Sequence, residues 1–499
     1  MRIYLFAICS LALCPVSVCQ AQGRQPAVSD VYKEYDSNQD GVLDAKEVAG
    51  SRYARQFPRW DVDRDNKVSA DEVIAFRRKF GIAADGTLLK SPQRAFVVPE
   101  IDDLKRVTKG VSLPREDARN SAFLLATEEH PVDGSGYVIL TDHVSPEFIE
   151  PLQKLAVHHD GQLVVVPDLA LLHQQADKFA EIQDHLRKAK VRYVGIAPRL
   201  ESFRENMVLG IWELLTTLDS DPQVDAFPGF LVASDAKAFS RLIDQSLAHD
   251  PISATELKPI AVSQVLSDAE TRSLQKAAML RKYFRGNGVE TPVVAVYGKN
   301  AKNAPRLDGK QVWNLVAPGG GKFIESFSPT LANTFAESNL IIMHGHGVPG
   351  MSCSVDVQGI PDDLRGKVLM TGSCFSASPV KSDLPEMREA PGGYSVQKRD
   401  AFILRAIDQG AVVAFGHQRL SSGFPHLYPV LDSWLQGQTV GEGYQQLLNG
   451  LIMLSGAKSG DFVIREPDKR PSQNLYLYVV IGDPALQPFS KRTDPNATR

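Results

Sequence analysis

From Gly136 onward, short apolar runs alternate with longer stretches in which apolar residues recur every three to four positions. Runs of four to seven apolar residues predict buried strands, and the longer periodic stretches predict amphipathic helices. The predicted strands are 137–141, 162–167, 191–197, 292–297, 340–343, 367–370, 411–415 and 475–481. The predicted helices are 145–158, 169–190, 235–248, 399–409 and 439–454. Such alternation is typical of an α/β fold with a mostly parallel sheet and helices on both faces.

The pattern also divides the chain into segments. We expect a first α/β subdomain over residues 131–298 and a second, carrying the candidate chemistry, over 299–489. Residues 81–130 are interpreted as a linker and lead-in, and residues 490–499 as a disordered polar tail. The length of 499 residues is sufficient for two to four domains, at roughly 150 residues per domain.

Two of the predicted strands end in small residues followed by a reactive one. Strand 340–343 leads into Gly345-His346-Gly347, and strand 367–370 leads into Gly372-Ser373-Cys374. In an open parallel sheet, ligands bind beyond the carboxyl ends of the strands. Neighbouring strands would therefore bring an imidazole and a thiol to one edge, as in a Cys/His nucleophilic site.

Other interpretations of these residues remain open at this point. His344 would share a side with His346 in an extended strand, so it is a rival or a helper. A Cys353–Cys374 disulfide would silence the thiol. The two histidines and two cysteines together could bind zinc, although their spacing fits no common structural site. Each side chain could also be an inert part of the core.

Residues 28–80 contain two calcium-loop patterns in tandem. Calcium requires six to eight oxygen ligands around a sharp turn, and the loops supply oxygen at the expected positions, with the position-7 residue acting through its backbone carbonyl. Gly41 occupies position 6 of the first loop, and Asn66, which tolerates the left-handed conformation, replaces it in the second. The first predicted ligand set is Asp36, Asn38, Asp40, Val42, Asp44 and Glu47. The second is Asp61, Asp63, Asp65, Lys67, Ser69 and Glu72.

The loops begin only 25 residues apart, at Asp36 and Asp61. One helix from about Asp44 to Trp60 would then leave the first loop and enter the second. This resembles the compact EF-hand pairs of secreted bacterial proteins, and it predicts a small all-α module that binds Ca2+ in a structural or docking role.

The N-terminus has the pattern of an export signal. Arg2 precedes an apolar run and a small-x-small site before Gln22, so residues 1–21 are interpreted as a signal peptide of a secreted or periplasmic protein. Three of the five cysteines lie in that segment, which excludes a disulfide scaffold for the rest. No later segment is long and apolar enough for a transmembrane span. The net charge of −4 gives no general attraction to nucleic acid. The sequence does not indicate the oligomeric state.

Over residues 136–489 the chain resembles the gingipain-type family of caspase-like (clan CD) cysteine peptidases. The resemblance lies in the opening strand 137–141, strand 191–197, the Gly-His-Gly and Ser-Cys elements, and the closing Ile481-Gly-Asp-Pro-Ala-Leu486. It implies a caspase-like fold in two subdomains, with His346 and Cys374 as the catalytic dyad and a protein or peptide as substrate. The chain departs from the family at Gly229-Phe230, where a Gly-Arg pair is usual.

These observations together predict a secreted, calcium-binding cysteine endopeptidase. The alternative is a non-catalytic calcium-binding interaction protein on a degenerate caspase-like scaffold. Glu337 and Asp356 are the candidates for a third catalytic carboxylate. An acidic specificity pocket for Arg or Lys could be formed by Asp383, Glu386 and Glu389.

Overall fold

The computed structural model divides the chain into two compact units, residues 1–102 and residues 103–499. The structure describes residues 27–49, 51, 57–61, 65–79, 84, 124–125, 136–268, 272–286, 288–316, 329–381, 396–398, 401–421, 427–455, 462 and 473–491. The expected signal peptide lies outside these residues, as do all but two residues of the expected tail. Among the described helices, none has the length and apolar character needed to cross a membrane.

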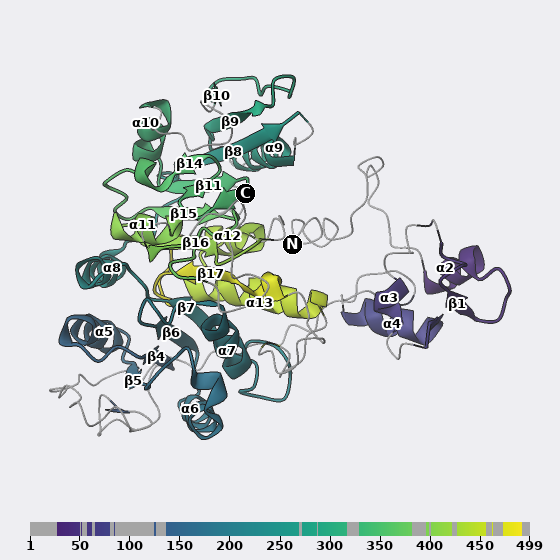
Figure 1. Cartoon of the computed structure of the whole chain (residues 1–499), viewed down its shortest axis with the longest axis horizontal. Helices are drawn as coiled ribbons and strands as arrows, with labels where there is room; N and C mark the ends of the chain where they lie inside the picture. The colour runs from purple at the N-terminus through teal and green to yellow at the C-terminus, as the bar shows by residue number, and fades with distance from the viewer. Residues whose placement is uncertain are drawn as a thin grey trace, which may run out of the picture. The chain divides into compact units, whose positions relative to one another are not determined.

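The larger unit is built on one sheet of 12 strands in the order β10-β9-β8-β11-β15-β16-β17-β7-β6-β4-β5-β3 (Figure 1). The strands along the chain are β3 Leu124–Leu125, β4 Tyr137–Thr141, β5 Gln162–Val165, β6 Tyr193–Ala197, β7 Phe227–Phe230, β8 Pro259–Ser267, β9 Val293–Asn300, β10 Val312–Val316, β11 Leu340–His344, β15 Val368–Thr371, β16 Val413–His417 and β17 Tyr478–Ile481. A separate sheet of three short strands comprises β12 Gly347–Val348, β13 Met351–Ser352 and β14 Val355–Asp356.

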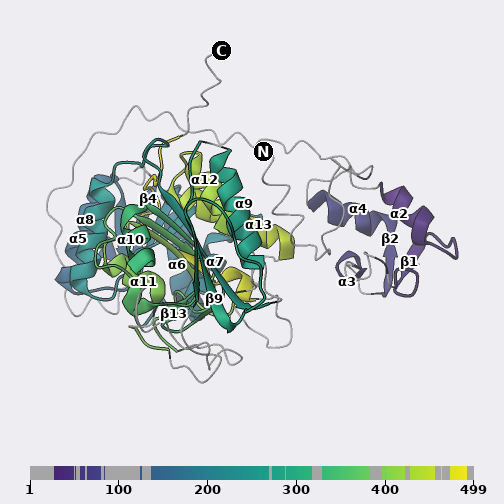
Figure 2. The same cartoon turned by 90° about the horizontal axis from the view of Figure 1, so that it is seen from above.

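Helices cover both faces of the large sheet. In two views, α5, α8, α10 and α11 lie on one face and α7, α9, α12 and α13 on the other (Figures 1 and 2). The helices are α5 Pro146–His158, α6 Ala176–Lys188, α7 Glu205–Leu215, α8 Ala236–Ala248, α9 Arg272–Arg285, α10 Pro329–Glu337, α11 Phe402–Asp408, α12 Leu427–Leu435 and α13 Val440–Ser455, with short 3-10 turns η2 Leu172–Gln174, η3 Val357–Gly359 and η7 Gln473–Tyr476. Because both faces are covered, strands such as β11 and β15 carry consecutive apolar residues rather than an alternating pattern. The predicted fold class, a mostly parallel α/β sheet with helices on both faces, is therefore confirmed.

Two strand pairs in the large sheet are antiparallel. The antiparallel pair β16–β17 lies in the middle of the sheet and joins the half from β10 to β16 to the half from β17 to β3. Since β17 is parallel to β7, the parallel strands of the two halves run in opposite directions. The pair β3–β5 lies at the outer edge. The carboxyl ends of β8, β11, β15 and β16 therefore form one edge of the sheet, opposite to the carboxyl ends of β4 to β7. The predicted boundary between two subdomains, at residues 298 and 299, stays a prediction. Strands from both sides of this boundary belong to the same sheet, in which β8 lies directly beside β11.

The chain order reverses between β8 and β11. From β8 the chain builds outward through β9 and β10, whereas β11 is followed by β15 and β16 on its other side. In open α/β sheets, ligands bind beyond the carboxyl ends of the strands at such a switch point, because the connections leave in opposite directions. Any site on this half of the sheet is expected there.

The closing segment Ile481-Gly-Asp-Pro-Ala-Leu486 has a structural role. A side chain at Gly229 would lie 2.6 Å from the Gly482 carbonyl oxygen, so this close approach requires glycine at 229. The buried Asp483 carboxylate accepts hydrogen bonds from the Tyr137 hydroxyl at 2.9 Å and the Ala485 N–H at 3.0 Å, and bonds His159 Nε2 at 2.8 Å. The segment thereby ties the first strands of this unit to its last.

Replacing Asp483 with alanine should destabilise the protein by about 2–4 kcal/mol, because the buried Tyr137 hydroxyl and the His159 ring lose their acceptor. Urea denaturation of the full chain measures this. Asp244→Ala is the matched control, since Asp244 pairs with Lys154 on the surface and both side chains are more than half exposed; its cost should stay below about 1 kcal/mol. Equal effects of the two substitutions would contradict the structural role of Asp483.

The smaller unit has its own apolar core. Its helices are α2 Val28–Tyr35, α3 Phe57–Trp60 and α4 Ala70–Lys79, and two short strands, β1 Val42–Asp44 and β2 Lys67–Ser69, pair antiparallel with Leu43 opposite Val68. The buried core residues are Val28, Val31, Leu43, Val48, Phe57, Trp60, Val68 and Val73. The predicted helix from Asp44 to Trp60 is wrong at its start, because Asp44 ends a strand and residues 45–49 form turns.

Candidate functional site

The turns that follow β11 and β15 lie against each other. These strands are parallel neighbours, with Met343 opposite Thr371. A side chain at Gly347 would lie 2.2 Å from the Cys374 carbonyl oxygen and 2.8 Å from Ser373 Cβ, so only glycine allows this packing. The structure therefore brings the His346 turn and the Cys374 turn together at the carboxyl ends of β11 and β15, next to the point where the strand order reverses.

The Cys374 turn is held by the end of β16. The Phe375 N–H donates to the Arg419 carbonyl at 2.9 Å, and the Ala377 N–H donates to the His417 carbonyl at 3.0 Å. Phe375 has a φ of 59°, a left-handed conformation that is rare for a bulky residue and typical of functional turns. These two backbone hydrogen bonds fix the position of the turn and of Cys374, which precedes Phe375.

The Cys374 thiol is half-buried and has one well-placed donor. The Ser421 N–H donates to Sγ at 3.2 Å, and the Ser421 hydroxyl lies 3.5 Å from Sγ. This backbone donor fixes the position of the sulfur in the turn. Within the described part of the chain, the Cys374 N–H makes no hydrogen bond, so it is available to an oxyanion.

His346 has an exposed side chain on a fixed backbone. Its N–H donates to Gln264 Oε1 at 2.7 Å, and its carbonyl accepts the Cys353 N–H at 2.9 Å. An exposed imidazole beside the Cys374 turn is suited to proton transfer with a bound molecule. Gln264 was not predicted from the sequence; a polar residue inside the apolar strand β8 was the available signal.

His344 occupies a different environment. It is buried, its ring stacks on Tyr428 with centroids 5.6 Å apart, and Nε2 bonds the Tyr428 hydroxyl at 3.2 Å. Burial lowers the pKa of His344 to about 3, and the Lys276 charge acts in the same direction. His344 is therefore a neutral core residue at physiological pH rather than a second base for Cys374.

The burial of His344 predicts acid destabilisation. Its folded-state pKa lies below the ordinary value of 6.5, so below pH 6.5 the unfolded chain binds more protons, and stability present at neutral pH is lost as the pH falls toward 3. From pH 7 to pH 5, the free energy of unfolding of His344→Phe should therefore fall by about 2 kcal/mol less than that of the parent protein. Urea denaturation at the two pH values measures the difference, and identical pH dependence of both proteins would contradict the prediction.

Cys353 is buried and packs against the Cys374 turn through Ser373. Cys353 and Ser354, with φ of 53° and 63°, make the two-residue turn between β13 and β14, as in a type I′ hairpin. The Cys353 sulfur lies 3.3 Å from the Ser373 hydroxyl, and burial raises the pKa of the Cys353 thiol to about 11. An uncharged thiol in this position fills space and does not act as a nucleophile.

Among the described residues, the structure shows neither the Cys353–Cys374 disulfide nor the zinc site that the sequence left open. Cys353 and Cys374 are both free. In the described part of the chain, the only three metal-ligating side chains with atoms within 4.8 Å of one another are Asp219, Asp221 and Asp225, far along the sequence from the two histidines. Burial and the two neighbouring carboxylates raise the pKa of Asp225 to about 7, which is a property of that loop alone.

A buried ion pair that the sequence did not reveal lies behind the Cys374 turn. Arg419 and Glu205 have side chains that are 2% and 0% exposed. Arg419 Nη2 also donates to the Val380 carbonyl at 2.8 Å, so the guanidinium holds the segment after Cys374. Removing one partner of such a pair leaves an uncompensated buried charge. The pair thus links α7 to the end of β16.

Asp356 and Glu337, the two candidates for a third catalytic carboxylate, lie at the ends of short helical elements. The Asp356 carboxylate accepts the Gln358 N–H at 2.7 Å and caps η3, and Glu337 is the last residue of α10. Asp383, Glu386 and Glu389, which were predicted to line an acidic pocket, lie outside the described residues.

The first calcium-loop pattern adopts a tight turn. Gly41 has a φ of 83°, and its N–H donates to one oxygen of Asp36 at 3.0 Å. The other oxygen, Asp36 Oδ1, is buried without a hydrogen-bond partner. Glu47 folds back over the loop and accepts the Ser37 N–H at 2.9 Å. A buried carboxylate oxygen with no donor is the environment that a cation would satisfy.

The second loop repeats these features. Asn66 has a φ of 63°, and its N–H donates to Asp61 at 3.1 Å, while Asp61 Oδ1 is buried without a partner. The Glu72 carboxylate accepts the Ser69 N–H at 2.8 Å. Asp63 lies outside the described residues. Position 1 of both loops thus carries a buried oxygen without a partner, as a calcium ligand would, while the described loop carboxylates do not lie in a group of three within 4.8 Å of one another.

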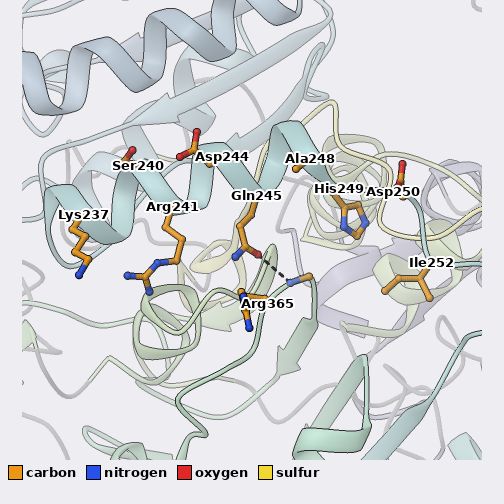
Figure 3. A pocket seen from close by; sticks show the side chains of 11 residues that line it. Lys237, Ser240, Arg241, Asp244, Gln245, Ala248, His249, Asp250, Ile252 and Arg365 are labelled. Carbon is orange, nitrogen blue, oxygen red and sulfur yellow. Dashed lines mark hydrogen bonds between the residues drawn. The ribbon is translucent and has the colours of Figure 1, made fainter.

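A separate cavity of about 860 Å³ lies along α8 (Figure 3). It is lined by Lys237, Arg241, Gln245, His249 and Arg365, among others. Gln245 accepts a hydrogen bond from the Gly366 N–H at 3.0 Å, just before β15 begins. The cavity is therefore at the amino end of β15, whereas Cys374 follows its carboxyl end, and we do not place the candidate chemistry there.

No protein-family model and no curated protein sequence matches this chain. Solved structures with some similarity include one described as "Structure of Protease", with 11% identity, 73% of this chain and 81% of that chain covered, and a TM-score of 0.42. Another is the separase–securin complex of Saccharomyces cerevisiae, with 12% identity, 61% and 17% coverage, and a TM-score of 0.32. Both TM-scores are below 0.5, so the proposal below rests on the geometry of this chain.

Proposed function

We propose that this protein is a cysteine-type endopeptidase with an N-terminal calcium-binding module. The observation that carries the proposal is the contact between the Gly345-His346-Gly347 and Gly372-Ser373-Cys374 turns beside the switch point of the sheet. This contact places an exposed imidazole and a half-buried thiol at the edge where ligands of such sheets bind.

The reaction would be thiol acyl transfer. The Cys374 thiolate attacks the carbonyl carbon of a peptide bond, and the Cys374 N–H donates to the resulting oxyanion. His346 protonates the departing amine as the C–N bond breaks, leaving a thioester. The neutral His346 then removes a proton from water, the resulting hydroxide cleaves the thioester to release the acid product, and the Cys374 thiolate and protonated His346 are restored.

The Ser421 contact gives the resting enzyme a defined thiol position. Its N–H donates to Sγ and would hold the sulfur against the segment that follows β16 until a substrate enters. Cys374 would therefore be poised before substrate binds, with the exposed His346 imidazole on the neighbouring turn.

The calcium part of the proposal rests on the two orphaned oxygens, Asp36 Oδ1 and Asp61 Oδ1. The ions would be held by the two predicted ligand sets and would stabilise the loops, without a part in the chemical step. Export by way of residues 1–21 also stays a proposal, based on the sequence pattern alone.

The test is cleavage of a broad peptide library by the full chain, with and without calcium, before and after treatment with iodoacetamide. We expect cleavage products that disappear after alkylation of Cys374. An intact library under all conditions would overturn the peptidase and favour the alternative, a non-catalytic calcium-binding interaction protein.

A further inference from the structure

The peptide group between Gly345 and His346 has both of its polar atoms bound by side chains. On one side, the His346 N–H donates to Gln264 Oε1 at 2.7 Å. On the other, the Gly345 carbonyl accepts the Ser373 hydroxyl at 3.1 Å. The two side chains belong to β8 and to the Cys374 turn, so they hold the peptide from both flanking elements.

Neither side chain is free to turn away. Gln264 is 2% exposed, and its Nε2 donates to the Ser354 hydroxyl, which directs Oε1 at His346. Ser373 is fully buried, and its hydroxyl is surrounded by those of Ser352 at 2.9 Å and Thr371 at 3.0 Å. The orientation of each group is thus determined by a second contact.

The two flanking glycines let the turn pack closely against its neighbours, on whose contacts its conformation depends. A side chain at Gly345 would lie 2.6 Å from Gln264 Cβ, and one at Gly347 would lie 2.2 Å from the Cys374 carbonyl oxygen. Glycine lets the turn approach its neighbours but adds conformational freedom to the backbone. The direction in which His346 projects must therefore be set by groups outside the turn.

We propose that Gln264 and Ser373 are positioning residues that clamp the Gly345–His346 peptide and so direct the His346 imidazole toward a substrate bound at Cys374. The catalytic meaning of this clamp rests on the proposed function. Neither residue touches the reacting atoms. A misplacement of about 1 Å at a proton-transfer group is enough to reduce the rate by about 100-fold, so the clamp should act on kcat.

The experiment compares Gln264→Met and Ser373→Ala with the parent full-length chain. Methionine keeps the length of glutamine without the acceptor, and alanine removes the donor to Gly345. Each variant should lower kcat by about 10- to 100-fold with KM within about threefold. A role in stability alone would lower the melting temperature and leave kcat per folded molecule unchanged.

A second readout follows the imidazole itself. The NMR signal of the His346 Cε1–H group, assigned through its loss in His346→Gln, should be single in the parent protein and shifted or split in both variants. Gln245→Met is the matched control, because Gln245 also accepts a backbone N–H, that of Gly366, at the other end of β15 (Figure 3). It should change neither kcat nor the His346 signal.

The outcomes separate the clamp from the proposed function. An unchanged His346 signal and unchanged kcat in both folded variants overturn the clamp. If the parent chain cleaves no peptide, the proposed function fails, but the His346 signal still decides whether the clamp exists. If Gln264→Met does not fold, Ser373→Ala gives the same two readouts from the opposite side of the peptide.

Discussion

Replacing Cys374 with alanine is expected to reduce peptide cleavage by about 10,000-fold or more, because the other thiol near the His346 turn, Cys353, is buried and its pKa is raised to about 11. Removal of a catalytic nucleophile typically costs this much, with residual activity left from binding and oxyanion stabilisation. Cleavage of a peptide identified from the library, measured at equal protein concentration, gives the ratio. Retention of more than about one tenth of the activity would exclude Cys374 as the nucleophile.

The two cysteines should also differ in reactivity. Cys374 is half-buried and accepts a hydrogen bond from the Ser421 N–H, whereas Cys353 is fully buried with a pKa raised to about 11. Since the thiolate is the reactive form, iodoacetamide should label Cys374 at least about 100 times faster than Cys353. Mass spectrometry of labelled peptides measures both rates in one sample.

Cys353→Ser is the matched control for this experiment. It removes the other thiol among the described residues and should leave the labelling rate of Cys374 within about threefold of the parent rate. Equal and slow labelling of both cysteines in the parent protein would contradict an activated Cys374, and with it the proposed peptidase.

Calcium is expected to raise the melting temperature of the smaller unit, and the double substitution Asp36→Ala with Asp61→Ala should abolish the rise. A ligand that binds only the folded state at 100 times its Kd stabilises that state by about 2.7 kcal/mol per site. The substitutions remove the two carboxylates whose Oδ1 atoms are buried without a partner. Differential scanning calorimetry of the full chain, with calcium and with a chelator, measures the shift.

Asp71→Asn is the matched control, because Asp71 is exposed in the first turn of α4, outside both ligand sets. It should preserve the calcium-dependent rise. A rise that survives in the double variant, or no rise in the parent protein, would show that the loops do not bind calcium as proposed.

The sequence predicted the parallel sheet well because its central strands are buried on both faces. Runs such as Leu340–Met343 and Val368–Met370 are apolar at every position, and only a covered strand tolerates that composition. The same runs indicated which turns follow the two strands. Strands of mixed composition were not recognised: β7 begins with Phe-Pro-Gly, and β8 contains Ser263 and Gln264.

By itself, the sequence determined that a histidine turn and a cysteine turn follow two buried strands, because apolar runs and the residues after them are local features. The tertiary structure alone decided the surroundings of each group. His344 and His346 are two positions apart, yet one is buried against Tyr428 and the other is exposed beside Cys374. Gln264 reaches His346 across 82 residues, and Ser421 reaches Cys374 across 47. Such contacts depend on strand order and register, which no local pattern of residues encodes.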